Sequence, residues 1–375
     1  MAGRSILFVT GTRADFGKLE PLALKSRDAG FNVSFFVTGM HMLKQYGLTK
    51  IEVHRLQDIY VHEFMNSRSD DPQDLILAKT VIGFSDFCRE HKPDLVVIHG
   101  DRVEALACSL VCAMNYIRSA HIEGGEVSGT IDELFRHCNS KLANHHFVSS
   151  KKAMERVMSM GEDNRTIYVI GSPELDFHSK NSGIKLGDVK KRYNIPFEEY
   201  GVVLFHPVTS EVDTIGYQAK SLYEELSASN KSFVVISPNN DPGAKDIISI
   251  MDALDKKKFR IIPSMRFAHF SELIRSASAI IGNSSAGVRE APFLGIPSLN
   301  IGTRQTNRSN APSIVNASAL DRRAILSFLN DIWGTRFKTH RAFGVGGAAE
   351  RFLKIIKDED FWSGHLQKVF KDYNK

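Results

Sequence analysis

Four acidic side chains stand near one another along the first half of the sequence. Asp101 follows one short apolar run, Glu123 and Glu126 follow the next, and Asp132 lies a few residues further on. Carboxyl groups crowded beside a low-dielectric cleft raise one another's pKa, so that one can hold a proton while another accepts one. The set therefore indicates acid–base chemistry, and the glycines beside it would let a ligand approach closely.

Each of these acids also has a purely structural interpretation. Asp132 lies four residues before Arg136, which is the spacing of an ordinary ion pair on a helix. Asp101 stands where it could cap the helix that follows it. Taken singly, the carboxylates leave both interpretations open, but as a set they favour a site.

The second half of the sequence carries a pattern suited to an anion. An apolar run ends at Gly282, and Ser284 and Ser285 follow at the expected start of a helix. Backbone N–H groups, serine hydroxyls and the positive end of a helix together suit a diphosphate. Glu290 could accept hydrogen bonds from paired ribose hydroxyls, and Arg304 could supply positive charge. The alternatives are a capping serine, a surface glutamate and a surface arginine.

Polar residues follow other apolar runs as well. Segment 11–18 (GTRADFGK) is a turn entering a helix, whose free backbone N–H groups and Arg13 could hold phosphate oxygens, although a plain turn fits equally. The segment does not match GxGxxG, so a dinucleotide site is not supported, and no HExxH-like metal spacing is found. A histidine side chain ordinarily titrates near neutrality, so His206 could act on the leaving group, or it could be a structural histidine.

The elements that must position these residues follow from short β-branched runs that alternate with segments of helical period. This alternation is typical of βαβ units and a parallel sheet, where ligands bind beyond the carboxyl ends of the strands. The predicted strands are 6–10, 33–37, 94–99, 119–123, 145–148, 202–205, 233–236, 259–262, 279–282 and 298–301. The predicted helices of the first half are 18–28, 74–90, 104–114 and 132–143.

The length of 375 residues predicts two domains, because one hydrophobic core rarely grows so large. The alternation breaks between Gly171 and about Pro196, where glycines, prolines and lysines indicate a linker. We expect an N-terminal Rossmann-like domain, a linker, a C-terminal Rossmann-like domain and a final helix that could pack back on the first domain. These are predicted at 1–175, 176–196, 197–357 and 358–375, respectively.

Composition excludes several classes of protein. The net charge is only +5 without a long basic run, which argues against a nucleic-acid binder. No apolar stretch reaches ~18 residues, so no transmembrane helix is expected, and the first apolar run is typical of a strand. The four cysteines form no CxxC pair. Cys108 and Cys112 lie in an apolar run and are expected to be buried core thiols in a protein of the reducing cytosol.

Taken together, the segments GTRADFG, VTGMH, HGDR, HIEGGEVSGTIDE, GSPELD, FHPVT, GNSSAGVREA and GTRQ are highly specific. The sequence resembles the hydrolysing UDP-N-acetylglucosamine 2-epimerases of bacterial sialic-acid synthesis and the epimerase half of the bifunctional animal enzyme. The likeness runs from about residue 6 to 352. It implies two Rossmann-like doubly wound domains in a glycosyltransferase-B arrangement with an inter-domain cleft. It also implies conversion of UDP-N-acetylglucosamine and water to N-acetylmannosamine and UDP, with no cofactor or metal.

Site residues follow from the resemblance position by position. The implied uridine-nucleotide contacts are Arg13, Arg102, Asn239, Ser284, Ser285, Glu290 and Arg304. The implied sugar-side residues are Asp101, Glu123, Asp132, Arg136 and His206. Elimination of UDP needs a base and rehydration needs an acid on the other face, and Asp101 and Glu123 are the pair we expect to serve. The resemblance further implies a cytoplasmic homodimer or homotetramer.

Two departures and several alternatives bear on this resemblance. Non-hydrolysing relatives carry Arg-Pro-Glu where this sequence has RADF from Arg13 onward, which favours the hydrolysing branch. Asp132 stands where the other branch has a glutamate, so its reach into the site is open. The alternatives are non-hydrolytic epimerisation, a UDP-linked 2,4-diacetamido-trideoxy substrate, a glycosyltransferase and an inactive nucleotide-sugar sensor. The acidic set argues against the sensor, because extra negative charge does not help to bind an anion.

Overall fold

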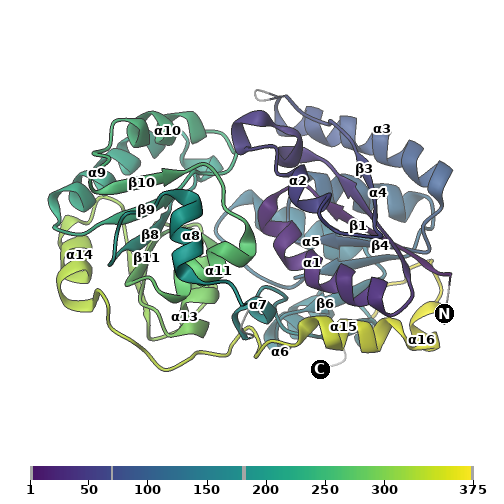
Figure 1. Cartoon of the computed structure of the whole chain (residues 1–375). Helices are drawn as coiled ribbons and strands as arrows, with labels where there is room; N and C mark the ends of the chain where they lie inside the picture. Colours follow the sequence, from purple (N-terminus) through teal and green to yellow (C-terminus); the bar gives the residue numbers. More distant parts are fainter. Residues whose placement is uncertain (1–2, 69–70, 180–182, 373–375) are drawn as a thin grey trace. The chain divides into compact units, whose positions relative to one another are not determined.

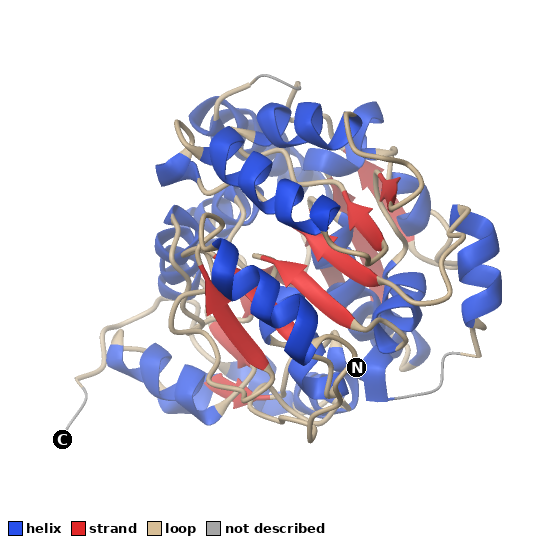
Figure 2. Ribbon diagram, turned by 90° about the vertical axis from the view of Figure 1, so that its left-hand side faces the viewer, coloured by secondary structure: helices blue, strands red, loops and turns tan. Residues whose placement is uncertain are grey.

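The computed structural model describes residues 3–68, 71–179 and 183–372, and the chain divides into two compact units (Figure 1). Unit 1 comprises Met1–Glu126, Asp132–Ser179 and Phe343–Lys375. Unit 2 comprises Val127–Ile131 and Lys180–Ala342. Each unit contains one parallel sheet whose strands are flanked by helices (Figure 2).

The sheet of unit 1 has seven parallel strands in the order β3-β2-β1-β4-β5-β6-β7. The strands are β1 (Ser5–Thr10), β2 (Asn32–Val37), β3 (Tyr60–Glu63), β4 (Leu95–His99), β5 (Ser119–Ile122), β6 (His145–Val148) and β7 (Ile167–Val169). Because the order reverses between β1 and β4, the connections leave the sheet in opposite directions at that point. This is the doubly wound topology that the sequence predicts.

The sheet of unit 2 repeats this topology with six parallel strands in the order β10-β9-β8-β11-β12-β13. The strands are β8 (Gly201–Leu204), β9 (Phe233–Ile236), β10 (Phe259–Ile262), β11 (Ala279–Gly282), β12 (Ser298–Ile301) and β13 (Ile314–Ala317). Here the order reverses between β8 and β11. The predicted fold class of two Rossmann-like parallel sheets is therefore confirmed.

Most helices lie between consecutive strands, and the last helices follow the final strand, β13. Those of unit 1 are α1 (Arg13–Asp28), α2 (Lys50–Val53), α3 (Gln73–His91), α4 (Val103–Met114), α5 (Ile131–Leu142), α6 (Lys151–Ser159), α7 (Leu175–Ser179), α15 (Ala348–Ile356) and α16 (Glu359–Ser363). Those of unit 2 are α8 (Leu186–Tyr193), α9 (Ile215–Ala228), α10 (Ala244–Asp252), α11 (Phe267–Arg275), α12 (Ser285–Val288), α13 (Glu290–Leu294) and α14 (Arg322–Ser327). Short 3₁₀ turns lie at Gly39–Met42, Lys44–Tyr46, Asn164–Thr166 and Thr209–Glu211, and α14 continues into a π-helical turn at Phe328–Ile332.

Each sheet is covered by apolar side chains on both faces. Along β1, Ile6 and Phe8 lie in one buried cluster with side chains of α1 and α15. Leu7 and Val9 lie in another cluster with side chains of α3 and α4. Strand β8 alternates in the same way between clusters that contain residues of α9 and of α11. Continuously apolar strands are expected where helices pack on both sides of a parallel sheet.

The domain boundaries differ from those expected. Helix α15 packs against α1 in unit 1, so the chain returns to that unit at Phe343, before the expected domain end at 357. The carboxylate of Asp176 fixes this return, because it accepts from the backbone N–H groups of Ala348 and Ala349 at 2.8 and 2.9 Å. The expected linker 176–196 contains most of α7 and all of α8, and residues 180–182 lie outside the described residues.

The expected C-terminal helix over 358–375 is wrong beyond Ser363, where α16 ends. The following segment packs on unit 1 without regular structure, because side chains of that unit bind its backbone. Arg118 donates to the carbonyl oxygen of Gly364 at 3.0 Å, and Asn144 donates to that of Leu366 at 3.1 Å. Residues 373–375 lie outside the described residues. Across the described part of the chain, no helix has both the length and the apolarity to cross a membrane.

Candidate active site

The predicted site residues follow the strands at which each sheet reverses its order. Arg13 follows β1, and Asp101 and Arg102 follow β4, the two strands that flank the reversal in unit 1. Ser284 and Ser285 follow β11, which flanks the reversal in unit 2. Ligands of open α/β sheets bind outside the carboxyl ends of the strands at this point. The sequence predictions and the topology therefore select the same edges.

Glu123 lies directly after β5 and is almost fully buried. Its carboxylate lies 3.0 and 3.1 Å from the ammonium of Lys18 and 3.3 Å from Nε2 of His99. Ser172 donates its hydroxyl hydrogen to the same carboxylate at 3.3 Å. The backbone of Glu123 is left-handed, with φ +68°, a conformation that costs a non-glycine residue about 1–3 kcal/mol. Such strain is typical of functional sites.

Lys18 links Glu123 to a second buried acid. Its ammonium lies 3.8 Å from the carboxylate of Glu174, which has no exposed surface. One buried cation thus lies between two buried carboxylates, a charged cluster of the kind found at active sites. Four of these residues were not predicted from the sequence: Lys18, His99, Ser172 and Glu174. Lys18 and Glu174 lie within or beside the segments GTRADFG and GSPELD, which is the signal that could have found them.

Asp101 is brought together with Arg136. The fully buried Arg136 donates from Nη2 to the carboxylate of Asp101 and from Nη1 to the carbonyl oxygen of Glu126 at 3.3 Å. The carboxylate of Glu126 in turn accepts from the hydroxyl of Ser149. Arg136 therefore pairs with an acid 35 residues earlier in the chain. Asp132 lies in the first turn of α5, the same helix that carries Arg136.

The turn after β1 differs from the expectation of free backbone donors. Asp15 accepts from the N–H groups of Gly11 and Thr12, each at 3.0 Å, and the hydroxyl of Thr12 accepts from Asp15 N–H at 3.2 Å. This capping box starts α1 at Arg13, five residues before the expected start at Lys18. The N–H groups of Gly11 and Thr12 are thus occupied within the chain, which favours the plain turn over a phosphate site at these two donors.

The two arginines of this edge lie near acids. A guanidinium nitrogen of Arg13 lies 3.9 Å from the carboxylate of Glu52. Nε of Arg102 lies 3.7 Å from the carboxylate of Glu104. Both acids are buried, so each arginine is oriented by a neighbouring negative charge. Their assignment to the nucleotide stays a prediction.

In unit 2, Asn283 joins the ends of neighbouring strands. Its side-chain oxygen accepts from His206 N–H at 2.7 Å, and its amide donates to the carbonyl oxygen of His206 at 2.8 Å. Arg304 and Gln305 both donate to the carbonyl oxygen of Asn283, at 3.3 and 2.9 Å. Asn239 N–H donates to Nδ1 of His206 at 3.1 Å. The structure thus brings together the predicted residues His206, Asn239 and Arg304 around an asparagine that was not predicted.

The hydrogen bonds of His206 fix its chemistry. Because Nδ1 accepts from the backbone of Asn239, the neutral ring must carry its hydrogen on Nε2. That nitrogen is a donor in both protonation states. A donor of this kind suits an anionic oxygen.

The serine pattern after β11 begins a helix, as expected, but this helix is only a single turn. The hydroxyl of Ser284 accepts from Ala286 N–H at 3.4 Å and caps α12, which contains only four residues. A single turn aligns few peptide dipoles, so the positive helix end is weaker than the sequence suggests. Ser285 is the first residue of α12, and the buried Glu290 is the first residue of α13.

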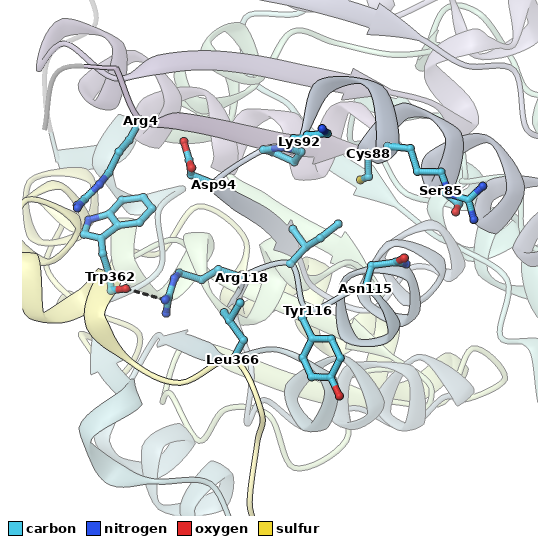
Figure 3. A pocket seen from close by; sticks show the side chains of 13 residues that line it. Arg4, Ser85, Cys88, Lys92, Asp94, Asn115, Tyr116, Arg118, Trp362 and Leu366 are labelled. Atoms are coloured by element: carbon cyan, nitrogen blue, oxygen red, sulfur yellow. Dashed lines mark hydrogen bonds between the residues drawn. The ribbon is translucent and has the colours of Figure 1, made fainter.

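A cavity of about 600 Å³ lies in unit 1, away from these residues (Figure 3). Arg4, Asp94 and Arg118 line it, and they directly precede β1, β4 and β5. It therefore opens at the amino ends of the strands, whereas the candidate residues follow the carboxyl ends. Arg118 donates there to the carbonyl oxygen of Trp362 at 2.7 Å and so holds the C-terminal segment.

Cys108 and Cys112 are buried core thiols, as predicted. Cys108 and Cys112 have no exposed surface and pack in the apolar cluster between α3, α4 and the sheet. Burial raises the pKa of both thiols well above the usual value. Among residues 3–68, 71–179 and 183–372, no group of three or more His, Cys, Asp or Glu side chains is arranged to hold a metal ion.

Two doubly wound units with charged and hydrogen-bonding side chains at the reversal of each sheet define a Rossmann-like protein of the kind that binds nucleotides. The fold is similar to that of a Methanocaldococcus jannaschii UDP-GlcNAc 2-epimerase solved with UDP-GlcNAc and UDP. The TM-score is 0.77 at 19% identity, over 95% of this chain and 99% of that chain. The family model described as UDP-N-acetylglucosamine 2-epimerase matches residues 23–357. The chain belongs to this family.

Two curated relatives cover nearly the whole chain. A UDP-N-acetylglucosamine 2-epimerase of Neisseria meningitidis serogroup B is 39% identical over 375 residues, 99% of this chain and 100% of the relative. A UDP-N,N'-diacetylbacillosamine 2-epimerase (hydrolyzing) of Legionella pneumophila is 30% identical over 97% of this chain and 98% of the relative. Both likenesses confirm the family resemblance found in the sequence motifs.

Proposed function

We propose that this epimerase is of the hydrolysing type and converts UDP-N-acetylglucosamine and water to N-acetylmannosamine and UDP, as the first step of sialic-acid synthesis. The observation that carries the proposal is the buried Lys18–Glu123–Glu174 cluster beside the Asp101–Arg136 pair at the strand ends of unit 1. The relative that is 39% identical is named a UDP-N-acetylglucosamine 2-epimerase, and this name does not mention hydrolysis.

The chemistry begins with departure of UDP. The hydrogen on the second carbon of the sugar is not acidic by itself. As the bond from the first carbon to the diphosphate oxygen lengthens, positive charge develops on the first carbon and acidifies the neighbouring C–H. Removal of that hydrogen gives 2-acetamidoglucal and UDP. Water then adds to the first carbon while a proton enters the second carbon from the opposite face, which gives the manno product.

Two separated carboxyl groups serve this sequence of steps. Asp101 and Glu123 follow neighbouring strands of one sheet. One of them serves as the base and the other as the acid. Arg136 holds the carboxylate of Asp101, and Lys18 holds that of Glu123, so each acid has a fixed orientation. An acid or base in such a position commonly contributes ~10²–10⁴-fold to the rate.

In this proposal unit 2 supplies most of the contacts to the uridine diphosphate, and Arg13 and Arg102 of unit 1 supply the others. The donors offered to it are the hydroxyls of Ser284 and Ser285, the guanidinium of Arg304 and Nε2 of His206. Glu290 would accept from the ribose hydroxyls. Donors fixed in advance at a departing anion stabilise the transition state, and removal of one commonly costs ~10²–10³ in rate. Asn283 supports the proposal because it orients both His206 and Arg304.

The proposal is tested by incubating the enzyme with UDP-N-acetylglucosamine in D₂O and following the products by NMR. We expect N-acetylmannosamine with deuterium at the second carbon and an equal amount of UDP. Product without solvent deuterium would remove the elimination step. UDP-N-acetylmannosamine without free UDP would instead identify non-hydrolytic epimerisation.

A second candidate substrate is the UDP-linked 2,4-diacetamido-2,4,6-trideoxy sugar. The Legionella relative named for such a sugar favours it, at 30% identity. The 39% relative is named for UDP-N-acetylglucosamine, which is why that substrate is preferred here. Assays of UDP release with both nucleotide sugars decide between them by the ratio of kcat/KM.

The cellular setting is part of the proposal. The free cysteines Cys88, Cys108, Cys112 and Cys138 suit a reducing compartment, so we expect a cytoplasmic enzyme. A homodimer or homotetramer stays a prediction from the family resemblance. Light scattering of the purified chain measures it.

A further inference from the structure

The turn that presents Asp101 is held through a single peptide oxygen. The carbonyl oxygen of Gly100 lies 2.7 Å from Nε2 of His121 and 3.1 Å from the amide nitrogen of Asn139. Gly100 itself is left-handed, with φ +68°, and its N–H donates to the carbonyl oxygen of Ile122 at 3.0 Å. The residue before Asp101 is thus bound to β5 and to α5 at the same time.

The hydrogen-bond pattern defines the state of His121. A carbonyl oxygen only accepts, so Nε2 must carry the ring hydrogen that it donates to Gly100. Nδ1 then accepts from the hydroxyl of Ser140, which lies 3.0 Å away. The ring has no exposed surface, and burial lowers its pKa to about 3 despite the hydrogen bond to Gly100. His121 is therefore a neutral donor with one defined tautomer.

The titratable groups that face His121 lie on or directly after the neighbouring strands of the same sheet. His99 precedes the Gly100 turn, Glu123 follows two residues after His121, and His146 lies opposite it on β6. Among the described residues, the side-chain hydrogen bonds to the carbonyl oxygen of Gly100 come from His121 and Asn139, and from none of these three groups. The hydrogen bond from Asn139 is the second support of that oxygen, and it comes from α5.

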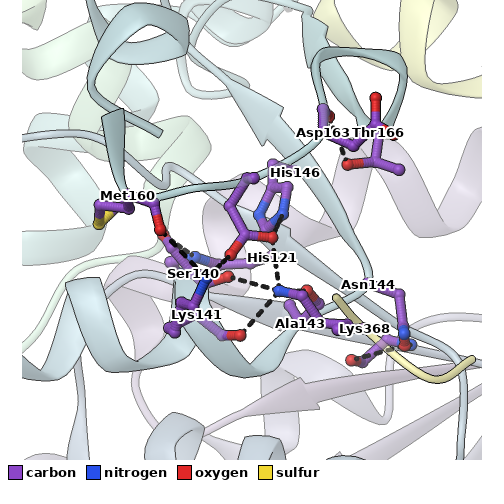
Figure 4. Close-up of polar contacts among 12 residues, drawn as sticks. His121, Ser140, Lys141, Ala143, Asn144, His146, Met160, Asp163, Thr166 and Lys368 are labelled. Atoms are coloured by element: carbon purple, nitrogen blue, oxygen red, sulfur yellow. Dashed lines mark hydrogen bonds and ion pairs between the residues drawn. The ribbon is translucent and has the colours of Figure 1, made fainter. Parts of the chain in front are cut away.

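Helix α5 cannot easily follow a shift of the turn, because its far end is anchored. The ammonium of Lys368 lies 2.7 Å from the carbonyl oxygen of Lys141 and 2.5 Å from that of Ala143, and it pairs with Glu162 at 2.6 Å (Figure 4). In the same view, Ser140 lies beside His121. The helix that supplies Arg136 and Asn139 is thus fixed, and the Gly100 turn is hydrogen-bonded to it through Asn139.

We infer that His121 is a positioning residue for Asp101. It donates to the peptide oxygen directly before the acid, and so keeps the carboxylate of Asp101 in contact with Arg136. The inference rests on the proposed function, because it assumes that Asp101 acts on the sugar. It adds a residue that touches neither the substrate nor a reacting atom, and whose effect passes through the backbone of Gly100.

The experiment compares three variants of the full chain. His121→Gln places an amide nitrogen near the position of Nε2 and keeps the donor, whereas His121→Asn is too short to reach Gly100. His145→Asn is the matched control, because His145 is also a buried histidine of unit 1, and burial lowers its pKa to about 3 as well. It lies at the amino end of β6 and contacts Arg118.

We expect His121→Asn to lower kcat by ~10–10²-fold with KM nearly unchanged, since small misplacements of a reacting group cost that much. His121→Gln should recover most of the loss, and His145→Asn should leave kcat unchanged. UDP affinity, measured by calorimetry, should change far less than kcat in all variants, because most of the predicted nucleotide contacts lie in unit 2. Recovery by glutamine separates donation to Gly100 from a general need for a folded core.

The inference is overturned if folded His121→Asn retains kcat, or if His121→Gln is as impaired as His121→Asn. If His121→Asn does not fold, His121→Gln still tests the inference, because it keeps the donor to Gly100 and should keep most of kcat. A folded His121→Gln whose kcat falls by ~10²-fold overturns the inference. Wild-type enzyme that releases no UDP from UDP-N-acetylglucosamine is a different result, and it rejects the proposed function instead.

Discussion

The two units share a topology but differ in what they bury. In unit 1, charged and titratable side chains are buried within the fold, including Lys18, Glu123 and Glu174 after the strands. Histidines with a lowered pKa are buried there too: His41, His121, His145 and His146. Unit 2 buries fewer charged side chains, among them Asp241, Arg289 and Glu290, and the ends of its β8 and β11 are joined by the neutral amide of Asn283.

The difference indicates a division of labour on one scaffold. Burying a charge costs stability unless it is paired, but crowded and desolvated acids obtain the shifted proton affinities that acid–base catalysis requires. Neutral donors and a guanidinium hold an anion without that cost and without adding negative charge. A unit built as unit 1 suits proton transfer, and a unit built as unit 2 suits binding of a diphosphate.

The largest expected effect comes from Glu123→Gln, which keeps the shape of the side chain and removes its proton chemistry. Turnover should fall by ~10²–10⁴-fold if Glu123 is an acid or base. UDP affinity should not change. Glu290→Gln is the matched variant in unit 2, where we expect weaker UDP binding and a smaller effect on kcat. Near-normal turnover of Glu123→Gln, measured by UDP release, would break the comparison.

Acid should destabilise unit 1 through its buried histidines. Burial is the main cause that lowers the pKa of His41 to about 4 and of His121 and His145 to about 3, from an ordinary value of 6.5. Between these values the unfolded chain binds more protons than the folded one, so stability falls as the pH falls below 6.5. Well below pH 6.5, each histidine lowers the free energy of unfolding by about 1.4 kcal/mol per pH unit, and the three together lower it by roughly 4 kcal/mol per pH unit.

The two tryptophans allow this loss to be assigned to a unit. Trp362 lies in unit 1 and Trp333 in unit 2, and the chain has no others. Trp333→Phe leaves Trp362 to report on unit 1, and Trp362→Phe leaves Trp333 to report on unit 2. In urea titrations at pH 6.5 and 5.5, we expect the midpoint to fall more for the Trp362 signal. An equal fall of both signals would contradict the contrast between the units.

Much of the fold follows from the sequence, and the omissions have a common cause. The strands that were predicted are the apolar ones, such as β1, β4, β8 and β11. The three that were not, β3, β7 and β13, all lie at an edge of their sheet. An edge strand has one unpaired side and needs fewer apolar residues, so its sequence pattern is weak. In β3, for instance, both ends are exposed.

The site residues that could be predicted are those that come directly after a strand in the sequence. Asp101 and Glu123 are found because ligands bind beyond strand ends, a rule that needs only the sequence. Lys18 lies within a helix, where a lysine is usually solvated, and only tertiary packing shows that it pairs with Glu123. The role of Asn283 depends likewise on contacts with residue 206, far along the chain.

The smallest expected effect comes from Ser284→Ala, and it tests the other side of the comparison. Its hydroxyl caps only the single turn of α12, so its removal should weaken UDP binding by about 1 kcal/mol, or roughly fivefold in Kd. At saturating substrate, kcat should change far less than in Glu123→Gln, because unit 2 is assigned to binding. Calorimetry with UDP and steady-state kinetics measure both. If kcat fell as steeply as in Glu123→Gln, the serine would contribute to the chemical step, and binding and catalysis would not divide between the units.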